Sequence, residues 1–401
     1  MSAAGAGASL RTLWLLGLAA FASGASMRVA DPLLPTLAGE FGAQVRDAAL
    51  VMTGFTAAYG LFQAIHGPVG DRFGKLRVIA LGLLGAALAA LGCAFSRGLA
   101  GLVLMRFLTG MTAGAVIPLS LAFIGDRFSY AGRQALLGRF IAGTLLGQSF
   151  GPLIGGALSD TLGWRATFVA LAVLFLTSGV LLLRERARVG DSGSGRYAPP
   201  WERYGAMLRS DRARPVLATV GIEGFLFFGA FGFVGTDLKL RFGLSDTVAG
   251  LVVAGFGLGG LAYSLVVARL VARYGEAGLV GRGGLVLMLC FVATALAPSP
   301  WLAAPFVALM GFGFYMLHNT LQVRATEMAP EARGAAVSFF ALSMFGGQAL
   351  GVATYGWVAA LVGYRLPFVA TGLALALLAL RFRLRLLAMA PRRAEGGGTG
   401  P

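Results

Sequence analysis

Apolar and polar residues alternate along this chain in long blocks, and each apolar block has about the length of a membrane span. Twelve such blocks follow one another with short polar segments between them. A helix needs about 20 mostly apolar residues to cross the hydrocarbon core of a bilayer. Each block therefore predicts one transmembrane helix, and the chain as a whole predicts an all-α polytopic membrane protein. The blocks lie roughly at residues 12–37, 47–67, 77–96, 99–124, 138–160, 164–184, 214–236, 247–270, 278–297, 301–324, 334–361 and 366–388.

Composition and the placement of charge agree with this reading. Only 12% of the 401 residues are charged, whereas soluble chains carry about 25% charged residues. The net charge of +16 would favour nucleic-acid binding in a soluble protein. With the N-terminus in the cytoplasm, however, 25 of the 33 Lys and Arg residues fall in cytoplasmic segments and six in external loops, which is the positive-inside pattern. We therefore expect cytoplasmic termini, membrane lipid around the helices and no nucleic-acid partner.

The longest polar segment divides the predicted helices into six and six. It runs from Arg184 to Arg214 and contains eight arginines, Pro199-Pro200 and a Gly/Ser-rich stretch. Such a composition is typical of a solvated linker. We predict an N-terminal six-helix bundle at residues 1–184, a cytoplasmic linker at 185–213, and a C-terminal six-helix bundle with a short cytoplasmic tail at 214–401.

The two halves resemble copies of one repeat, because several residues recur 200 positions later. Chance matches of Gly are common in such a chain, whereas matches of Arg and of Phe-Val-Ala are less easily accidental. The matches pair Gly147-Gln148, Gly151, Gly156, Gly163, Arg165 and Phe168-Val169-Ala170 with Gly347-Gln348, Gly351, Gly356, Gly363, Arg365 and Phe368-Val369-Ala370.

A charged, glycine-rich turn joins predicted helices 2 and 3. It reads Gly-Pro-Val-Gly-Asp-Arg-Phe-Gly-Lys-Leu-Arg and resembles the G-x3-D-R-x-G-R/K-R/K signature of the major facilitator superfamily, with Leu76 in place of a cation. The resemblance implies two pseudo-symmetric six-helix bundles related as parallel repeats. It also implies a cytoplasmic gate that contacts the start of helix 11 at Pro330-Glu331-Ala332-Arg333. Alternatively, the charges only orient the helices. The gate residues are Gly67, Gly70, Asp71, Arg72, Gly74, Lys75 and Arg77.

Predicted helix 5 carries a second resemblance. Its residues Gly147, Gly151, Pro152, Gly155 and Gly156 follow a spacing similar to the G-x3-G-P-x2-G-G motif of proton-coupled drug exporters. The chain therefore most resembles the 12-span drug:proton antiporter branch of the superfamily. Small residues every fourth position also let helices pack closely, so a purely structural role for these glycines stays open.

Ionisable residues inside the predicted helices mark the candidate chemistry. They are Arg28 and Asp31 on helix 1, Arg106 on helix 4, Glu223 on helix 7 and His318 on helix 10, whereas helices 3, 6, 9 and 12 have none. Charged groups within a membrane face protein or water. This partition therefore predicts that helices 1, 4, 7 and 10 line a central cavity.

Three of these residues are candidates for proton coupling. We expect Glu223 to carry the proton, because loss of hydration favours the neutral form of a carboxyl group. Asp31 and His318 are the other two candidates. The alternative is a permanent ion pair between Glu223 and one of the arginines. The candidates for contact with a substrate are Arg28, Arg106, Tyr59, Gln63, Phe227, Tyr315, Asn319 and Gln322.

These features predict a secondary transporter rather than an enzyme. The expected function is export of a small drug-like or metabolite solute by proton-coupled alternating access, with no cofactor and no metal. The alternative is an importer or facilitator for a sugar, amino acid or organic anion, and Arg28 and Arg106 favour an anion. Lys75 and Lys239 are the only lysines beside many arginines, which favours a bacterial protein and hence the inner membrane. The resemblance implies a monomer.

Overall fold

The structure is a computed structural model that describes residues 3–127, 130–190, 205, 208–328 and 333–389. The elements assigned in these ranges are all helical. They are α1 Ala3–Arg28, η1 Asp31–Leu33, α2 Leu34–Glu40, α3 Val45–Ala48, α4 Leu50–Phe73, α5 Lys75–Ala94, α6 Leu99–Ala113, α7 Val116–Arg127, α8 Tyr130–Leu162, α9 Trp164–Val189, α11 Ala213–Glu223, η2 Gly224–Phe228, α12 Gly229–Phe231, α13 Val234–Phe242, α14 Asp246–Leu296, α15 Pro300–Glu327, α16 Arg333–Val362 and α17 Arg365–Met389.

The described helices account for the twelve predicted spans. Ten of them are long and apolar enough to cross a membrane. One of the ten, α14, has 51 residues and is broken at Gly275, where φ is 63°. A straight helix of that length would extend about 77 Å, far beyond the ~30 Å of hydrocarbon, so α14 contains two spans. The twelfth is α17, which carries Arg381, Arg383 and Arg385 near its end.

Several spans are interrupted where the sequence contains Pro or Gly. The first predicted helix ends at Arg28, and the chain continues through the short helices η1 and α2, which contain Pro32 and Pro35. Proline has no N–H to donate to the preceding turn. The seventh span passes through a π-helical turn, η2, directly after Glu223. Wide turns of this kind inside helices often mark functional sites.

The same close helix contacts occur in both bundles, 200 residues apart. In each case a glycine lies so near the backbone of a neighbouring helix that an added Cβ would collide with it. The contacts explain why the glycines of the sequence repeat recur at these positions. The pairs are Gly147 with Phe21 and Gly24 with Thr144 in the first bundle, and Gly347 with Gly221 and Gly224 with Met344 in the second.

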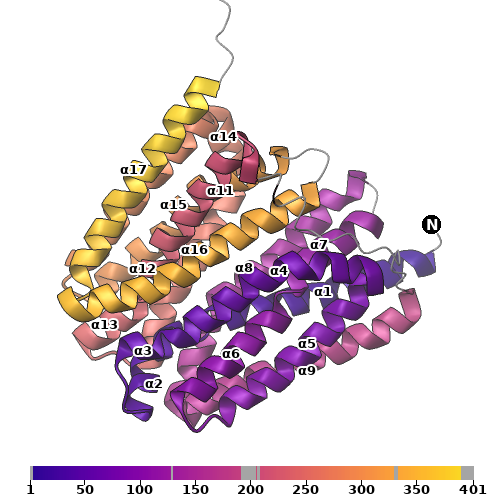
Figure 1. Cartoon of the computed structure of the whole chain (residues 1–401), viewed down its shortest axis with the longest axis horizontal. Helices are drawn as coiled ribbons and strands as arrows, with labels where there is room; N and C mark the ends of the chain where they lie inside the picture. The colour runs from indigo at the N-terminus through magenta and orange to yellow at the C-terminus, as the bar shows by residue number, and fades with distance from the viewer. Residues whose placement is uncertain (1–2, 128–129, 191–204, 206–207, 329–332, 390–401) are drawn as a thin grey trace, which may run out of the picture.

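The two bundles meet along two pairs of long helices, α4 with α16 and α8 with α14. In Figure 1 the N-terminal bundle (indigo to pink) and the C-terminal bundle (red to yellow) lie side by side, with α4 and α16 at their junction. The short elements α2, α3 and α13 gather at one end of this junction. We call this the α2–α13 end.

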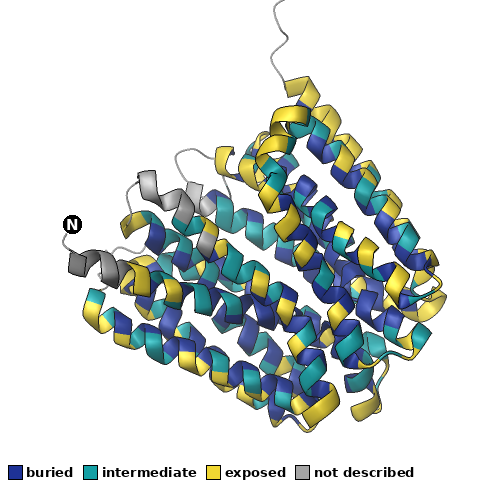
Figure 2. Cartoon of the chain, turned by 180° about the vertical axis from the view of Figure 1, so that it is seen from behind, coloured by how far each residue is buried: buried dark blue, intermediate teal, exposed yellow. Residues whose placement is uncertain are grey.

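Burial follows the pattern expected in lipid. Figure 2 shows buried residues facing the interior of each bundle and exposed residues on the outward faces of the long helices. Many of the exposed residues are apolar, such as Leu88, Leu265 and Leu361, whose side chains are 74–79% exposed. Large exposed apolar patches mark interaction or membrane surfaces, so the outer face suits hydrocarbon.

Candidate functional site

Glu223 and His318 form a buried acid–base pair in the C-terminal bundle. His318 Nδ1 lies 2.7 Å from Glu223 Oε2, and both side chains are buried. The imidazole stacks on Phe314 at 4.9 Å between ring centres and packs against Phe340 of α16. The other carboxylate oxygen, Oε1, is buried without a hydrogen-bond partner. The structure therefore brings two of the three proton-coupling candidates together.

The local fold places this carboxyl group between three helices. Glu223 is the last residue of α11, and His318 lies on α15. Gly224, the next residue, lets the backbone of α16 approach at Met344. A single buried proton shared by Glu223 and His318 leaves the pair neutral overall, either as acid with imidazole or as carboxylate with imidazolium. Removing that proton leaves a buried negative charge, which is costly in an apolar environment.

Arg28, Asp31 and Arg106 form a second charged group near the junction of the bundles. Arg28 Nη1 lies 3.2 Å from Asp31 Oδ2. Arg106 donates to the carbonyl of Ser26 at 2.8 Å and to its hydroxyl at 3.1 Å. All three charged side chains are buried. Among the described residues, Glu223 is therefore hydrogen-bonded to His318 rather than to either arginine.

This second group has more positive than negative charge and several unsatisfied atoms. Its two arginines face one carboxylate. Arg28 Nη2, Arg106 Nε and both oxygens of Asp31 are buried without hydrogen-bond partners. The guanidinium of Arg28 lies over the rings of Phe231, at 4.5 Å, and Phe228, at 5.2 Å. Both rings belong to the other bundle, so Arg28 reaches across the junction.

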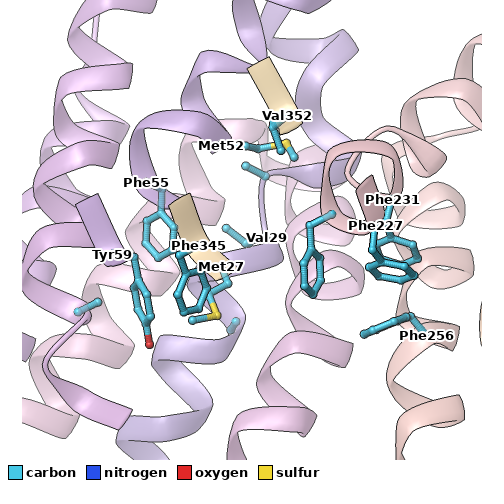
Figure 3. Close-up of a cluster of buried hydrophobic side chains, with 14 of the residues drawn as sticks. Met27, Val29, Met52, Phe55, Tyr59, Phe227, Phe231, Phe256, Phe345 and Val352 are labelled. Carbon is cyan, nitrogen blue, oxygen red and sulfur yellow. The ribbon is translucent and has the colours of Figure 1, made fainter. Parts of the chain in front are cut away.

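The aromatic candidates divide into two sets. Figure 3 shows Tyr59 and Phe55 grouped with Phe345, and Phe227 grouped with Phe231 and Phe256. The Tyr59 ring lies 4.9 Å from that of Phe345 on α16, so this contact joins the bundles. Phe227, by contrast, is fully buried in the aromatic core of the C-terminal bundle, 4.5 Å from the ring of Phe314.

The remaining polar candidates differ in exposure. Tyr59 shares a hydrogen bond of 3.1 Å with Ser23. Asn319 donates to the hydroxyl of Tyr263 at 3.3 Å. The last three candidates are Gln63, which is buried, Tyr315, which is half-buried, and Gln322, which is exposed.

The charged gate residues, which lie in the last turns of α4 and the first turn of α5 rather than in a loop, have a partner that the sequence did not reveal. Lys75 Nζ lies 2.9 Å from Asp71 and 2.8 Å from Asp126, which is near the end of α7. Gly74 at the turn has φ 97°, a conformation that suits glycine. The expected contact with the start of helix 11 cannot be described, because residues 329–332 lie outside the described ranges. An acid at the end of the fourth span, on the same predicted side, was the available signal for Asp126.

The helix 5 glycines pack α8 against two neighbours. Gly147 and Gly151 face the backbone of α1, Gly155 faces Val29 directly after α1, and Gly156 faces the backbone of α14 at Asp246. The carbonyl of Pro152 in α8 lies against Gly250 of α14. This motif therefore joins the first helix of its own bundle to the opposite bundle.

A polar network centred on Asp246 closes the α2–α13 end, and sequence reasoning missed it. The buried carboxylate of Asp246 pairs with Lys239 and accepts hydrogen bonds from Thr36 and Ser159, each 2.7 Å long. Thr36 and Ser159 belong to the N-terminal bundle, so two of these bonds cross the junction. Next to it, Asp160 accepts from the backbone N–H of Thr247 at 2.7 Å, in the first turn of α14. The sequence signal for this network was Lys239, the only lysine of the second half, which lies close to Asp246 in the chain.

Comparison with known proteins follows the same lines. The family described as Major Facilitator Superfamily matches residues 16–332 and, in an overlapping match, residues 216–400. An uncharacterized MFS-type transporter of Bacillus subtilis, YwfA, is 27% identical over 359 residues, which cover 87% of this chain and 85% of YwfA. The class B tetracycline resistance protein of Escherichia coli is 28% identical over 312 residues, covering 76% of this chain and 77% of that protein. A solved POT family transporter bound to a thioalcohol-conjugated peptide aligns with a TM-score of 0.78 at 16% identity, covering 95% of this chain and 96% of the other.

Proposed function

The chain belongs to the Major Facilitator Superfamily, and on that basis we propose that it exports a small drug-like or metabolite solute across the bacterial inner membrane in exchange for protons. Within the superfamily, its motifs most resemble those of the 12-span drug:proton antiporter branch. The observation that carries the proposal is the buried Glu223–His318 pair.

The pair has the properties that a proton carrier needs. Its two groups sit 2.7 Å apart in an aromatic environment, where a bound proton neutralises the carboxylate. Carboxyl and imidazole groups inside a membrane commonly form proton relays. We assign the proton to the pair as a unit, since strongly interacting sites titrate together. Asp31 contacts the cation Arg28 at 3.2 Å rather than a second group that can exchange a proton, and we rank it below the Glu223–His318 pair.

Direct contacts connect the pair to the junction between the bundles. The ring of His318 packs on Phe340 of α16. Further along α16, the side chain of Phe345 sits against Gly60 and Tyr59 of α4. A change in protonation that moves α16 would therefore act on the contact at which the two bundles slide or rock. This is the coupling that alternating access requires.

Three observations support the direction and orientation. The helix 5 motif resembles that of exporters. The chain also matches 77% of the length of a relative that is named a tetracycline resistance protein. The excess of cations at the end that holds the termini supports a cytoplasmic orientation of that end. The polar network at the α2–α13 end then closes the external side.

One proton entering down 100 mV supplies about 2.3 kcal/mol, which supports a solute concentration ratio of about fifty.

A second candidate function rests on Arg28. Two buried arginines against one carboxylate leave the junction with an unbalanced positive charge, and Arg28 Nη2 has no hydrogen-bond partner. A solute with a carboxylate or phosphate would supply both the missing negative charge and a hydrogen-bond acceptor for Arg28 Nη2. The alternative is therefore a transporter of the same fold for an organic anion, working as an importer or facilitator.

Dye-monitored proton flux in inside-out vesicles tests the proposal. Respiration sets up a pH gradient, and lipophilic cations, sugars and organic acids are added in turn to wild type and Glu223→Gln. We expect one class of solute to dissipate the gradient in wild type and not in the variant. Glu276→Gln is the matched control, because Glu276 is a half-exposed carboxylate that pairs with Arg324 of the same bundle.

The outcomes separate the candidates. Dissipation that persists in Glu223→Gln moves the proton site to Asp31 or His318. Uptake of a radiolabelled organic acid without any proton movement contradicts antiport and supports the second candidate.

A further inference from the structure

A continuous stack of side chains connects the proton pair to Arg28 of the opposite bundle. The imidazole of His318 lies on the ring of Phe314, with 4.9 Å between the ring centres and an angle of 14° between the ring planes. The ring of Phe228 meets that of Phe314 in a T-shaped contact, with the centres 5.2 Å apart. The guanidinium of Arg28 lies 5.2 Å from the centre of the Phe228 ring. Two aromatic rings therefore bridge the space between the pair and the N-terminal bundle.

The rings of this stack are enclosed by the protein. Phe314 and Phe228 are both buried. A further ring, that of Phe231, lies 4.5 Å from the guanidinium of Arg28 and holds it against the same face of the C-terminal bundle. Protein interiors are close-packed and transmit displacement, because they have little free volume to absorb it. A shift of Phe314 therefore reaches Phe228 and, through it, Arg28.

The backbone connects the same two points a second time. Glu223 directly precedes the π-helical turn η2, and Phe228 is its last residue. A π-helical turn is closed by i→i+5 hydrogen bonds, so a return to α-helical bonding would rotate Phe228 relative to Glu223. The equivalent residues of the first bundle, 24–28, lie within the α-helix α1. The wide turn thus occurs in the bundle that holds the proton pair and not at the equivalent place in the other.

The first contact of the stack depends on the charge of His318. A cation over the face of an aromatic ring is attracted by the negative face of that ring. An imidazolium at His318 is therefore held more tightly on Phe314 than a neutral imidazole is. From α16, the ring of Phe340 faces the imidazole. The charged and titratable groups next to the stack are Glu223 against His318, Asp31 and Tyr315 beside Arg28, Arg106 beside Asp31, and Tyr263, which is bonded to Asn319, the residue after His318.

We propose that Phe314 and Phe228 are positioning residues that transmit the protonation of the Glu223–His318 pair to Arg28 across the junction. The inference rests on the proposed function, in which this pair carries the proton. A proton gained by the pair draws Phe314 toward the imidazole, Phe228 follows, and Arg28 loses its present seat on the C-terminal bundle. The balance between the two states of the junction then changes with pH, although neither ring binds a proton itself.

Electron–electron resonance between spin labels on the two bundles tests the inference without any solute. Labels at Gln44→Cys and Pro298→Cys occupy exposed positions, and the two buried native cysteines are replaced by alanine. We expect the ratio of the two distance populations to change at least about fivefold between about pH 5.5 and about pH 8.5, the size of a typical coupling between two sites. Phe314→Leu and Phe228→Leu should each leave the ratio the same at both pH values. Phe228→Tyr keeps the ring and should retain the change.

Phe291→Leu is the matched control. Phe291 is a fully buried ring of the same aromatic core, 5.8 Å from the ring of Phe227, and it lies outside the stack. Its substitution removes a ring of the same size and should leave the pH response unchanged. Histidine-labelled protein gives a second control by NMR, because His66 and His318 are the two histidines of the chain. The His318 signal should still titrate in Phe314→Leu, which shows that the proton site survives.

The outcomes keep this inference apart from the proposed function. A pH response that persists in Phe314→Leu contradicts the inference, as does one that Phe291→Leu removes equally. A His318 signal that no longer titrates in Phe314→Leu also contradicts it, because Phe314 then only supports the pair. Loss of the response in Phe340→Leu alone assigns the transmission to α16 instead. A wild type whose distances do not change with pH overturns the inference, whereas proton flux in the vesicles decides the proposed function separately.

Discussion

The network around Asp246 should hold the α2–α13 end closed, and two small substitutions can test this. Thr36→Val and Ser159→Ala each remove one hydroxyl that donates to the Asp246 carboxylate across the junction. Both substitutions nearly preserve side-chain volume. They also leave the Lys239–Asp246 ion pair in place, so no charge is left buried and alone.

The size of the effect follows from the bonds removed. A hydrogen bond to a charged group contributes about 1.5–3 kcal/mol net of water. The Ser159 bond is buried and the Thr36 bond is partly buried, so we take the lower part of that range for each. Thr36→Val also removes the acceptor of a bond from Lys239, but the ammonium of Lys239 is partly exposed and can bond to water instead. Their joint loss, about 3 kcal/mol, shifts the equilibrium between the closed and open states of this end by about 10²-fold. The single variants should each shift it by about tenfold.

Distances between spin labels report this equilibrium directly. Labels at Gln44→Cys and Pro298→Cys sit on exposed positions of the two bundles at the α2–α13 end. A second pair, Ala187→Cys and Ala388→Cys, samples exposed positions at the other end. The native cysteines are both buried and would be replaced by alanine. We expect the first distance to lengthen and the second to shorten in the double variant.

Thr161→Val is the control for this experiment. Its hydroxyl bonds within α8, to the carbonyl of Ala157 at 2.7 Å, and does not cross the junction. If the double variant and Thr161→Val give the same distance distributions, the hydroxyl bonds at Asp246 do not stabilise the closed end, and the reasoning is wrong.

Two further predictions concern packing and the buried guanidinium. Gly151→Ala and Gly351→Ala should each lower the free energy of unfolding by about 1–3 kcal/mol, because the added Cβ meets the backbone of a neighbouring helix. Gly346→Ala should not lower the free energy of unfolding, because nothing lies within 4 Å of the added Cβ. Thermal unfolding in detergent compares the three variants. Arg106→Lys should reduce the initial rate of solute transport about tenfold, because lysine keeps the charge but lacks the planar guanidinium that donates two bonds to Ser26. Arg97→Lys is the control: Arg97 lies in an exposed loop, and its substitution should leave the rate unchanged.

The twelve spans could be predicted from the sequence because membrane insertion depends on local composition. In α14 the helix is broken at Gly275, and the apolar pattern of the sequence separates residues 247–270 from 278–297 on either side of this glycine. The interruption after Arg28 was not predicted in detail. A long apolar run conceals it, and the two prolines at 32 and 35 only indicate a break once the helix geometry is known.

The individual chemical groups were also visible, whereas their pairing was not. A glutamate or histidine in an apolar run is conspicuous on its own. Which of the cations Glu223 faces depends on how α11 and α15 pack, across 95 positions of sequence. Asp246 was overlooked for a different reason. It sits where a loop was expected, and a charge in a loop is ordinarily solvated, but here α2 and α8 cover it.

The repeat explains why the chemistry of the two halves differs while their packing does not. Gly24, Gly147 and Gly151 face a neighbouring backbone, and each has a glycine 200 positions later that does the same. The charged positions have diverged: the counterparts of Arg28 and Asp31 are Phe228 and Phe231, and the counterpart of Glu223 is Ser23. Arg28 also lies over Phe228 itself, 5.2 Å from the ring centre. Two equivalent residues can touch only near the axis that relates the repeats, so Arg28 marks that axis. A solute bound there would contact both bundles in every state, whereas the proton pair, inside one bundle, can change charge without breaking that contact.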